Sequence, residues 1–180
     1  LYIDDLIDIL INQLDNIRDG LQIGKIDKIY TISLGELAKM LSAFKDSRVS
    51  LLSENVGVGI CRALYATYIS YLPSNQFSYS LPIHGDQRGI FVEMLKTKDS
   101  GQFSFFTAHP GISRGNHYHH TKSEKFLVIK GHAKFNFQNM ITNEKYTITT
   151  RGGEAVIVES IPGWAHNIIN IGTDEMIVML

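Results

Sequence analysis

Three histidines and one glutamate in the second half of the sequence have the types and spacing of a metal site. His117 and His119 are separated by one residue, Glu124 follows after four more, and His166 lies further along. Alternate residues of a strand point to the same face, so His117 and His119 can present their imidazoles to one point. We expect a short turn to bring Glu124 back beside them on the next strand, with His166 closing the set from a later strand.

This donor set leaves the metal open. Three neutral imidazoles and one carboxylate suit zinc, iron(II), manganese or nickel, and spacing alone does not choose among them. His120 could replace His119 only if that part of the strand reversed its facing. The competing interpretation is that His117, His119 and His120 form a solvated strand end, with His166 a core residue.

The spacing around these residues resembles the two sequence motifs of the cupin family. The first motif is matched at every position, by Gly111, His117, His119, Glu124 and Gly131. The end of the second is matched by Pro162, Gly163, His166 and Asn170, whereas Gly153 lies too far upstream. The resemblance implies a jelly-roll barrel in which His117, His119, Glu124 and His166 bind a metal.

The sequence has two parts with different hydrophobic patterns, and the second part contains the candidate site. Before Pro73, apolar residues recur at helical spacing over 5–17, 33–44 and 61–72, and Ser33 with Glu36 forms a capping-box signature. After Pro73 the apolar period becomes two, as in Ala133 to Phe137, with glycines at turn-like intervals. The pattern predicts an α+β fold class with two domains, residues 1–73 and 74–180, the second an all-β sandwich or barrel.

A second resemblance concerns the substrate. The run Gly85 to Glu93 is similar to a segment of the nucleotide-sugar 3,5-epimerases of the rhamnose pathway, whose Arg and Glu help bind the nucleotide sugar. It implies substrate binding by Arg88, Phe91 and Glu93. The alternative is that Arg88 and Glu93 form a surface salt bridge with each other.

Those epimerases need no metal, and the sequence departs from them where a metal would matter. Residues 114–118 resemble the segment that carries their catalytic base histidine, but His119 stands where they typically have Gln. Counting back from Gly131 suggests Glu124 in place of their enolate-stabilising Lys. A divalent cation acting as a Lewis acid could therefore replace the lysine, and no catalytic base can be named.

The first half carries weaker resemblances. Residues 1–6 and 31–41 resemble segments of extended short-chain dehydrogenase/reductases acting on nucleotide sugars, so residues 1–73 are expected to be the C-terminal portion of such a reductase domain, without its Rossmann core. The chain starts at Leu1 without Met and ends on the apolar run Glu175 to Leu180. We therefore expect a fragment of a longer protein.

The order of reductase followed by cupin resembles the bifunctional capsular polysaccharide enzyme of the CapF type. The resemblance implies that the cupin epimerises C3 of a UDP-4-keto-6-deoxy-N-acetylhexosamine with zinc, other divalent metals staying open. The reductase would then reduce C4 with NADPH, a cofactor of the parent protein only, to give a UDP-N-acetyl-6-deoxytalosamine for capsule synthesis.

Composition and charge argue against some classes of binding partner. With a formal net charge of −1 and no run of five Lys or Arg, the sequence has no electrostatic footprint for nucleic acid or an anionic membrane. No apolar run approaches the roughly 18 residues of a membrane span, and Cys61 is the only cysteine. We expect a cytoplasmic homodimer that binds a UDP-sugar. Two alternatives stay open: an iron(II) dioxygenase, and a non-catalytic sugar-binding module that anchors a dimer.

Overall fold

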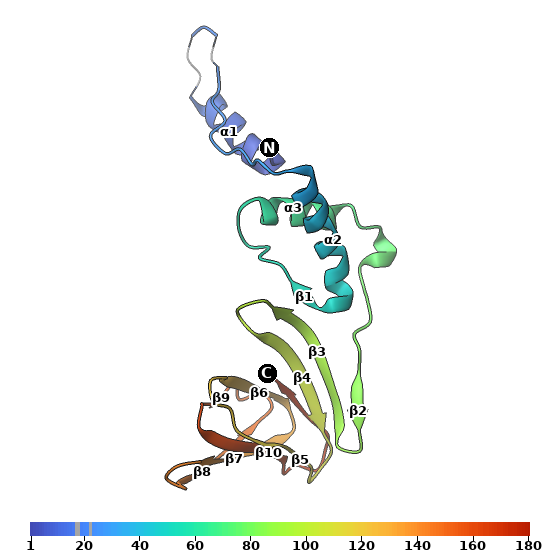
Figure 1. Ribbon diagram of the computed structural model, residues 1–180, viewed down its shortest axis with the longest axis vertical. Helices are drawn as coiled ribbons and strands as arrows, with labels where there is room; N and C mark the ends of the chain where they lie inside the picture. Colours follow the sequence, from blue (N-terminus) through green and yellow to red (C-terminus); the bar gives the residue numbers. More distant parts are fainter. Residues whose placement is uncertain (17–18, 22) are drawn as a thin grey trace. The chain divides into compact units, whose positions relative to one another are not determined.

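The computed structural model describes residues 1–16, 19–21 and 23–180. These residues form two compact units, Leu1–Tyr79 and Ser80–Leu180. Helices lie in the first unit, and most strands lie in the second (Figure 1). The domain boundary predicted between residues 73 and 74 stays a prediction. Among the described residues, no helix is both long and apolar enough to cross a membrane.

The first unit is built from short helices. Its elements are α1 (Ile3–Asp15), α2 (Leu34–Ser50), the two-residue strand β1 (Leu52–Ser53), α3 (Gly59–Ser70) and the 3-10 turn η1 (Ser74–Gln76). The capping box predicted at the start of α2 is confirmed: Ser33 Oγ accepts from the Glu36 N–H at 3.2 Å, and the Ser33 N–H donates to Glu36 Oε2 at 3.1 Å. Ile17, the predicted last apolar position of the first helix, lies outside the described residues.

One aromatic cluster holds two of these helices together. Phe44 of α2 is only 2% exposed, and its ring centroid lies 5.2 Å from that of Tyr65 and 5.9 Å from that of Tyr68, both on α3. The apolar positions that the helical spacing predicted in α2 and α3 therefore do pack against each other.

The predicted fold class, an α+β fragment with a mostly helical reductase portion, is wrong. The described residues form three α-helices but eleven strands, so the chain is mostly β, and its described part contains no helical portion of a short-chain dehydrogenase/reductase fold. The cause of the error is physical. Helical periodicity reports that a helix has an apolar face, but it does not report which tertiary fold that face packs into.

The second unit consists of antiparallel strands in two sheets, as its period-two pattern predicted. The strands are β2 (His84–Asp86), β3 (Gly89–Thr97), β4 (Gln102–Ala108), β5 (Ser113–His117), β6 (Glu124–Lys130), β7 (His132–Asn139), β8 (Lys145–Arg151), β9 (Ile157–Ser160), β10 (Trp164–Asn170) and β11 (Met176–Met179). One sheet has the order β3-β4-β11-β6-β9, with β2 paired to β3, and the other has the order β5-β10-β7-β8.

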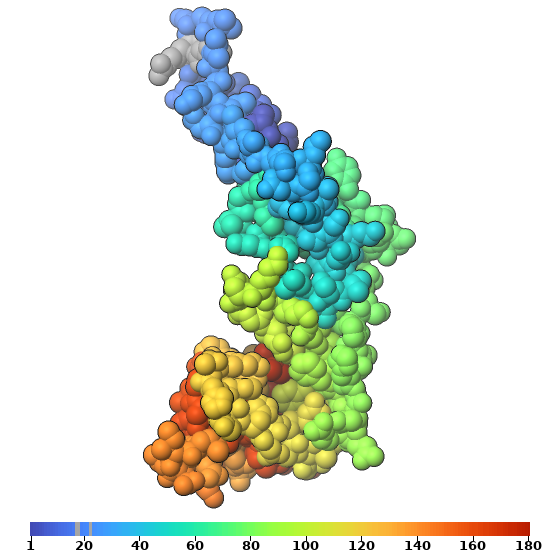
Figure 2. Space-filling view, in the orientation of Figure 1, coloured from blue at the N-terminus to red at the C-terminus, as the bar shows by residue number. Residues whose placement is uncertain are grey.

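Side chains from both sheets of this unit form one core. Phe106, Phe126 and Met176 come from the first sheet, and Phe135 and Ile168 from the second, all at most 5% exposed. The last strand, β11, pairs with both β4 and β6. Figure 2 accordingly shows dark-red C-terminal residues among much earlier, yellow ones. This two-layer arrangement is the frame that positions the candidate metal centre.

Candidate metal centre

The four predicted ligands come together inside the second unit. β5 pairs with β10 so that His117 lies opposite His166, and their ring centroids are 4.8 Å apart. His119 follows β5, with its ring centroid 4.8 Å from that of His117 and 6.2 Å from that of His166. Glu124 is the first residue of β6. Three strands of two different sheets thus supply one cluster.

The close approach of β5 to β10 depends on Gly115. Its backbone has φ +92°, which glycine adopts without strain, and an added Cβ would lie 3.0 Å from the carbonyl oxygen of His166. A larger residue would push apart the strands that carry His117 and His166.

The imidazoles of the cluster converge on a single oxygen. Nε2 lies 3.2 Å from Glu124 Oε2 for both His119 and His166, and 3.8 Å for His117. Ligand atoms at about 2.0–2.2 Å from a tetrahedral zinc ion lie roughly 3.3 Å from one another. The two spacings of 3.2 Å match this value, and the spacing of 3.8 Å to His117 is longer.

Buried polar atoms at this point have unmet bonding capacity. Within the described part of the chain, His119 Nε2 and Glu124 Oε2 are buried and have no hydrogen-bond partner. Leaving such atoms unsatisfied is costly, and native proteins avoid it. A cation bound by both atoms would satisfy them, so the residues present fit a divalent metal. The assignment of the four residues as ligands stays a prediction.

The electrostatics favour the ligand forms of these groups. The neighbouring His166 imidazole holds the pKa of the Glu124 carboxyl well below its usual range, and the Lys122 ammonium adds to this effect, although burial opposes it. Burial lowers the pKa of His117, and His166 lowers it further, whereas Glu124 acts in the opposite direction. An ionised carboxylate and a neutral imidazole are the states that bind metal.

A pocket of about 320 Å³ opens beside the cluster, and it contains two cationic side chains. Its lining includes Phe91 and Gln102 as well as Arg114 and Lys122. Lys122 Nζ donates to Glu124 Oε1 at 2.8 Å. Sequence reasoning missed Lys122, because counting back from Gly131 led to Glu124. The available signal was a lysine two residues before a predicted ligand.

The three predicted substrate-binding residues lie in different places. Phe91 lines the pocket beside the ligands. Arg88 lies in a neighbouring hollow, where it binds Asp86. Glu93 pairs with Lys96 at 3.0 Å and does not contact Arg88 among the described contacts, so the alternative of an Arg88–Glu93 salt bridge is wrong. Their role in substrate binding stays a prediction.

Comparisons with known proteins show to which family the chain belongs. A family model described as the polysaccharide biosynthesis C-terminal domain matches residues 84–180. A relative from Pseudomonas aeruginosa, named UDP-2-acetamido-2,6-beta-L-arabino-hexul-4-ose reductase, is 55% identical over 99% of this chain and 48% of its own length.

Solved structures agree. The chain is similar to the capsular polysaccharide assembling protein CapF from Staphylococcus aureus, with a TM-score of 0.91 and 35% identity over 99% of this chain and 52% of that one. The same values hold for CapF with the inhibitor 3-isopropenyl-tropolone. The chain spans about half the length of these relatives. Since the family model matches more than half of the chain and the likeness to CapF extends over nearly all of it, the chain belongs to the family of polysaccharide biosynthesis C-terminal domains and is of the CapF type.

Proposed function

We propose that this cupin domain epimerises C3 of a UDP-4-keto-6-deoxy-N-acetylhexosamine with a bound divalent metal, zinc being the metal we expect. The single observation that carries the proposal is the convergence of His117, His119 and His166 on one oxygen of Glu124 beside a pocket. The relative's printed name, a reductase of a UDP-linked hexulose, supports the substrate class.

The reaction needs a proton removed from a carbon and a place for the charge that results. In a 4-keto sugar the C3 proton is acidified by the adjacent carbonyl, and its loss puts negative charge on the C4 oxygen. A metal held by the four ligands would supply Lewis-acid charge at that oxygen. Lys122 and Arg114 line the same pocket and add fixed positive charge to its wall.

The base is a separate question. An imidazole that binds a metal through Nε2 no longer offers that lone pair to a proton, which argues against His117, His119 and His166 at that atom. Lys122 donates a hydrogen bond to Glu124, as an ammonium does. We therefore assign no catalytic base.

The second reaction of the proposal lies outside this chain. We propose that the NADPH-dependent reduction of C4, giving a UDP-N-acetyl-6-deoxytalosamine for capsule synthesis, belongs to the half of the relatives' length that this chain does not span. Binding of a UDP-sugar and formation of a homodimer are parts of the same proposal.

Deuterium exchange tests the epimerase directly. The zinc-loaded chain, incubated in deuterated water with the 4-keto sugar and no NADPH, should exchange the C3 proton, as followed by NMR. Glu124→Gln should lose exchange together with its metal. Glu159→Gln is the matched control. Glu159 pairs with Lys125 at 2.7 Å on the same two strands, β6 and β9, but both side chains are exposed and neither lines the pocket beside the ligands.

The same assay separates the alternatives. A folded, zinc-replete chain that shows no C3 exchange contradicts the epimerase and leaves the sugar-binding module. Oxygen uptake by the iron-loaded chain, with no exchange, would identify a dioxygenase instead.

A further inference from the structure

The two carboxylate oxygens of Glu124 have different surroundings. Oε2 is the atom on which the imidazoles of the cluster converge, and it is buried without a hydrogen-bond partner among the described residues. Oε1 instead accepts a hydrogen bond from Lys122 Nζ at 2.8 Å. The Glu124 side chain is only 8% exposed, so water has little access to it. One oxygen is therefore available to a metal, and the other is occupied by an ammonium group.

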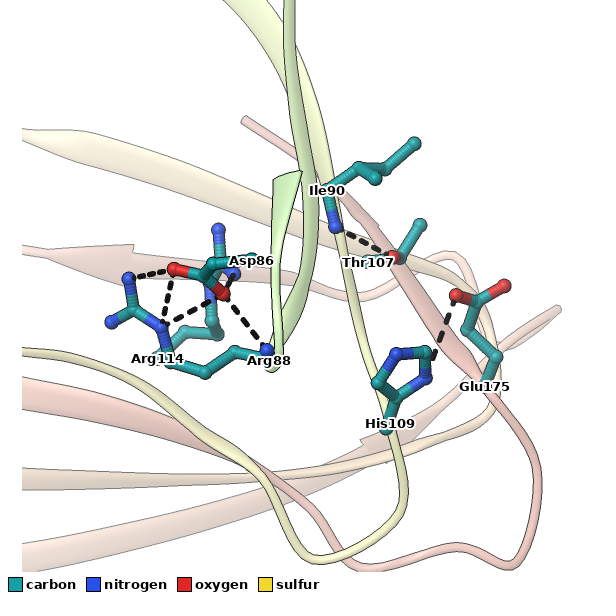
Figure 3. Close-up of polar contacts among 7 residues, drawn as sticks. All are labelled: Asp86, Arg88, Ile90, Thr107, His109, Arg114 and Glu175. Atoms are coloured by element: carbon teal, nitrogen blue, oxygen red, sulfur yellow. Dashed lines mark hydrogen bonds and ion pairs between the residues drawn. The ribbon is translucent and has the colours of Figure 1, made fainter. Parts of the chain in front are cut away.

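Lys122 reaches Glu124 from the solvent side of the cluster. It lies in the segment between β5 and β6, two residues before Glu124, and its side chain is 50% exposed. Arg114, another cation in the wall of the same pocket, faces a different anion, because its Nη1 lies 3.9 Å from Asp86 Oδ1 (Figure 3). Lys122 is thus the cation that the structure places on Glu124 Oε1.

The number of oxygens that Glu124 contributes decides what a bound metal can still accept. A carboxylate can bind a metal through one oxygen or through both. Three imidazoles and one oxygen supply the four bonds of a tetrahedral site, and a catalytic metal can expand to a fifth bond. If both oxygens of Glu124 bound the metal, the carboxylate itself would take that fifth bond. A site that binds substrate therefore needs a carboxylate that is kept to one oxygen.

We propose that Lys122 is a positioning residue: by holding Oε1, it confines Glu124 to one bond with the metal, through Oε2, and keeps a further position open toward the pocket. Charge-assisted hydrogen bonds are stronger than neutral ones, and the outer partners of metal ligands fix the orientation of those ligands. The open position is where the C4 oxygen of the 4-keto sugar would bind. The inference rests on the proposed function for the metal and for the class of substrate.

Lys122→Met isolates this effect. Methionine keeps most of the apolar stem of the half-exposed side chain and removes the ammonium group. Oε1 of the buried Glu124 carboxylate then lacks its donor, which is costly, and a metal on the neighbouring oxygen offers a replacement. We expect Oε1 to turn to the metal, so that the carboxylate binds through both oxygens and closes the open position.

Cobalt(II) in place of zinc makes the number of bonds visible, because four-coordinate cobalt(II) absorbs visible light much more strongly than five-coordinate cobalt(II). Each chain is loaded with cobalt, checked by metal analysis, and titrated with free imidazole at a pH where imidazole is neutral. The parent chain should show the strong spectrum and lose intensity as imidazole binds. Lys122→Met should show the weak spectrum before imidazole is added, and should bind imidazole roughly tenfold more weakly, because a carboxylate oxygen must first leave the metal.

Two variants serve as controls. Lys122→Arg keeps a cationic donor and should match the parent more closely than Lys122→Met does, in both the spectrum and the imidazole affinity. Lys125→Met removes an equal charge three residues along the chain, from an exposed lysine that pairs with Glu159 at 2.7 Å and lies outside the described lining of the pocket. It should leave both readouts unchanged, whereas an effect of charge alone would appear in both methionine variants.

The outcomes distinguish this inference from the epimerase proposal. The parent spectrum or the parent imidazole affinity in Lys122→Met would overturn the positioning role even if C3 exchange is normal, and so would equal changes in Lys122→Met and Lys125→Met. A parent chain that takes up no cobalt would remove the metal site and this inference together. If the spectra behave as expected but the zinc-loaded parent chain exchanges no C3 proton, the epimerase proposal alone fails.

Discussion

Asn170 is a completely buried side chain whose hydrogen bonds join the end of β10 to the end of β4 and to the segment between β10 and β11. Its Nδ2 donates to the carbonyl oxygens of Ala108 and Asp174, both at 2.8 Å, and its Oδ1 accepts from the Gly172 N–H at 2.9 Å. Asn170→Ala removes all three bonds and leaves their partners without this amide. At about 1 kcal/mol for each bond, the free energy of unfolding should fall by about 3 kcal/mol.

Thermal and urea denaturation, followed by circular dichroism, measure this loss. For a chain of this size, about 3 kcal/mol corresponds to a fall in Tm of roughly 6–12 °C. Gln138→Ala is the control, since this amide makes a more exposed bond to Asn143 at 3.2 Å and should cost less than about 0.5 kcal/mol. A loss below about 1 kcal/mol for Asn170→Ala would refute the reasoning.

Three further predictions concern the metal, the assembly and the acid range. Chelation should lower the unfolding free energy of the metal-loaded chain by about 2.7 kcal/mol if free zinc had been 100 times its Kd; calorimetry should show this in the parent chain and not in Glu124→Gln. Sedimentation at micromolar concentration should show a dimer, and monomer alone would contradict that part of the proposal. Arg88 lowers the pKa of Asp86 from 3.8 to about 2, so its ionised form stabilises the fold above pH 3.8 and that contribution is lost as the pH falls through about 2. NMR titration of the Asp86 carboxyl should give a higher pKa in Arg88→Gln than in the parent chain, because the side-chain hydrogen bonds are lost while the backbone N–H of residue 88 still donates; equal values would contradict the pairing.

The cluster itself could be predicted because its geometry is mostly local. His117 ends β5, His119 follows it after one residue, and one short loop then leads to Glu124 at the start of β6, which is enough to bring the three side chains near one another. The motif glycine Gly131 has a reason that only the fold shows: its φ is +89°, and an added Cβ would lie 2.9 Å from the Cα of Met176 on β11. His166 required the pairing of distant strands, and here the motif resemblance supplied what spacing could not.

Other features depend on irregularities that spacing does not reveal. The register of β3 against β4 shifts between Glu93 and Leu95, and Glu93 pairs with Lys96 instead of Arg88. Lys122 lies in a turn, where no period predicts a direction. The likeness of residues 1–6 and 31–41 to a reductase rested on short segments, and short apolar patterns fit many folds. The helices were therefore predicted, but their tertiary assignment was wrong.

Anomalous diffraction at the zinc edge, from crystals of the zinc-loaded chain, tests the central claim most directly. The account predicts one peak per chain, at about 2.0–2.2 Å from Nε2 of His117, His119 and His166 and from a carboxylate oxygen of Glu124. A fully loaded crystal with no peak there, or with zinc bound only by other residues, would contradict it.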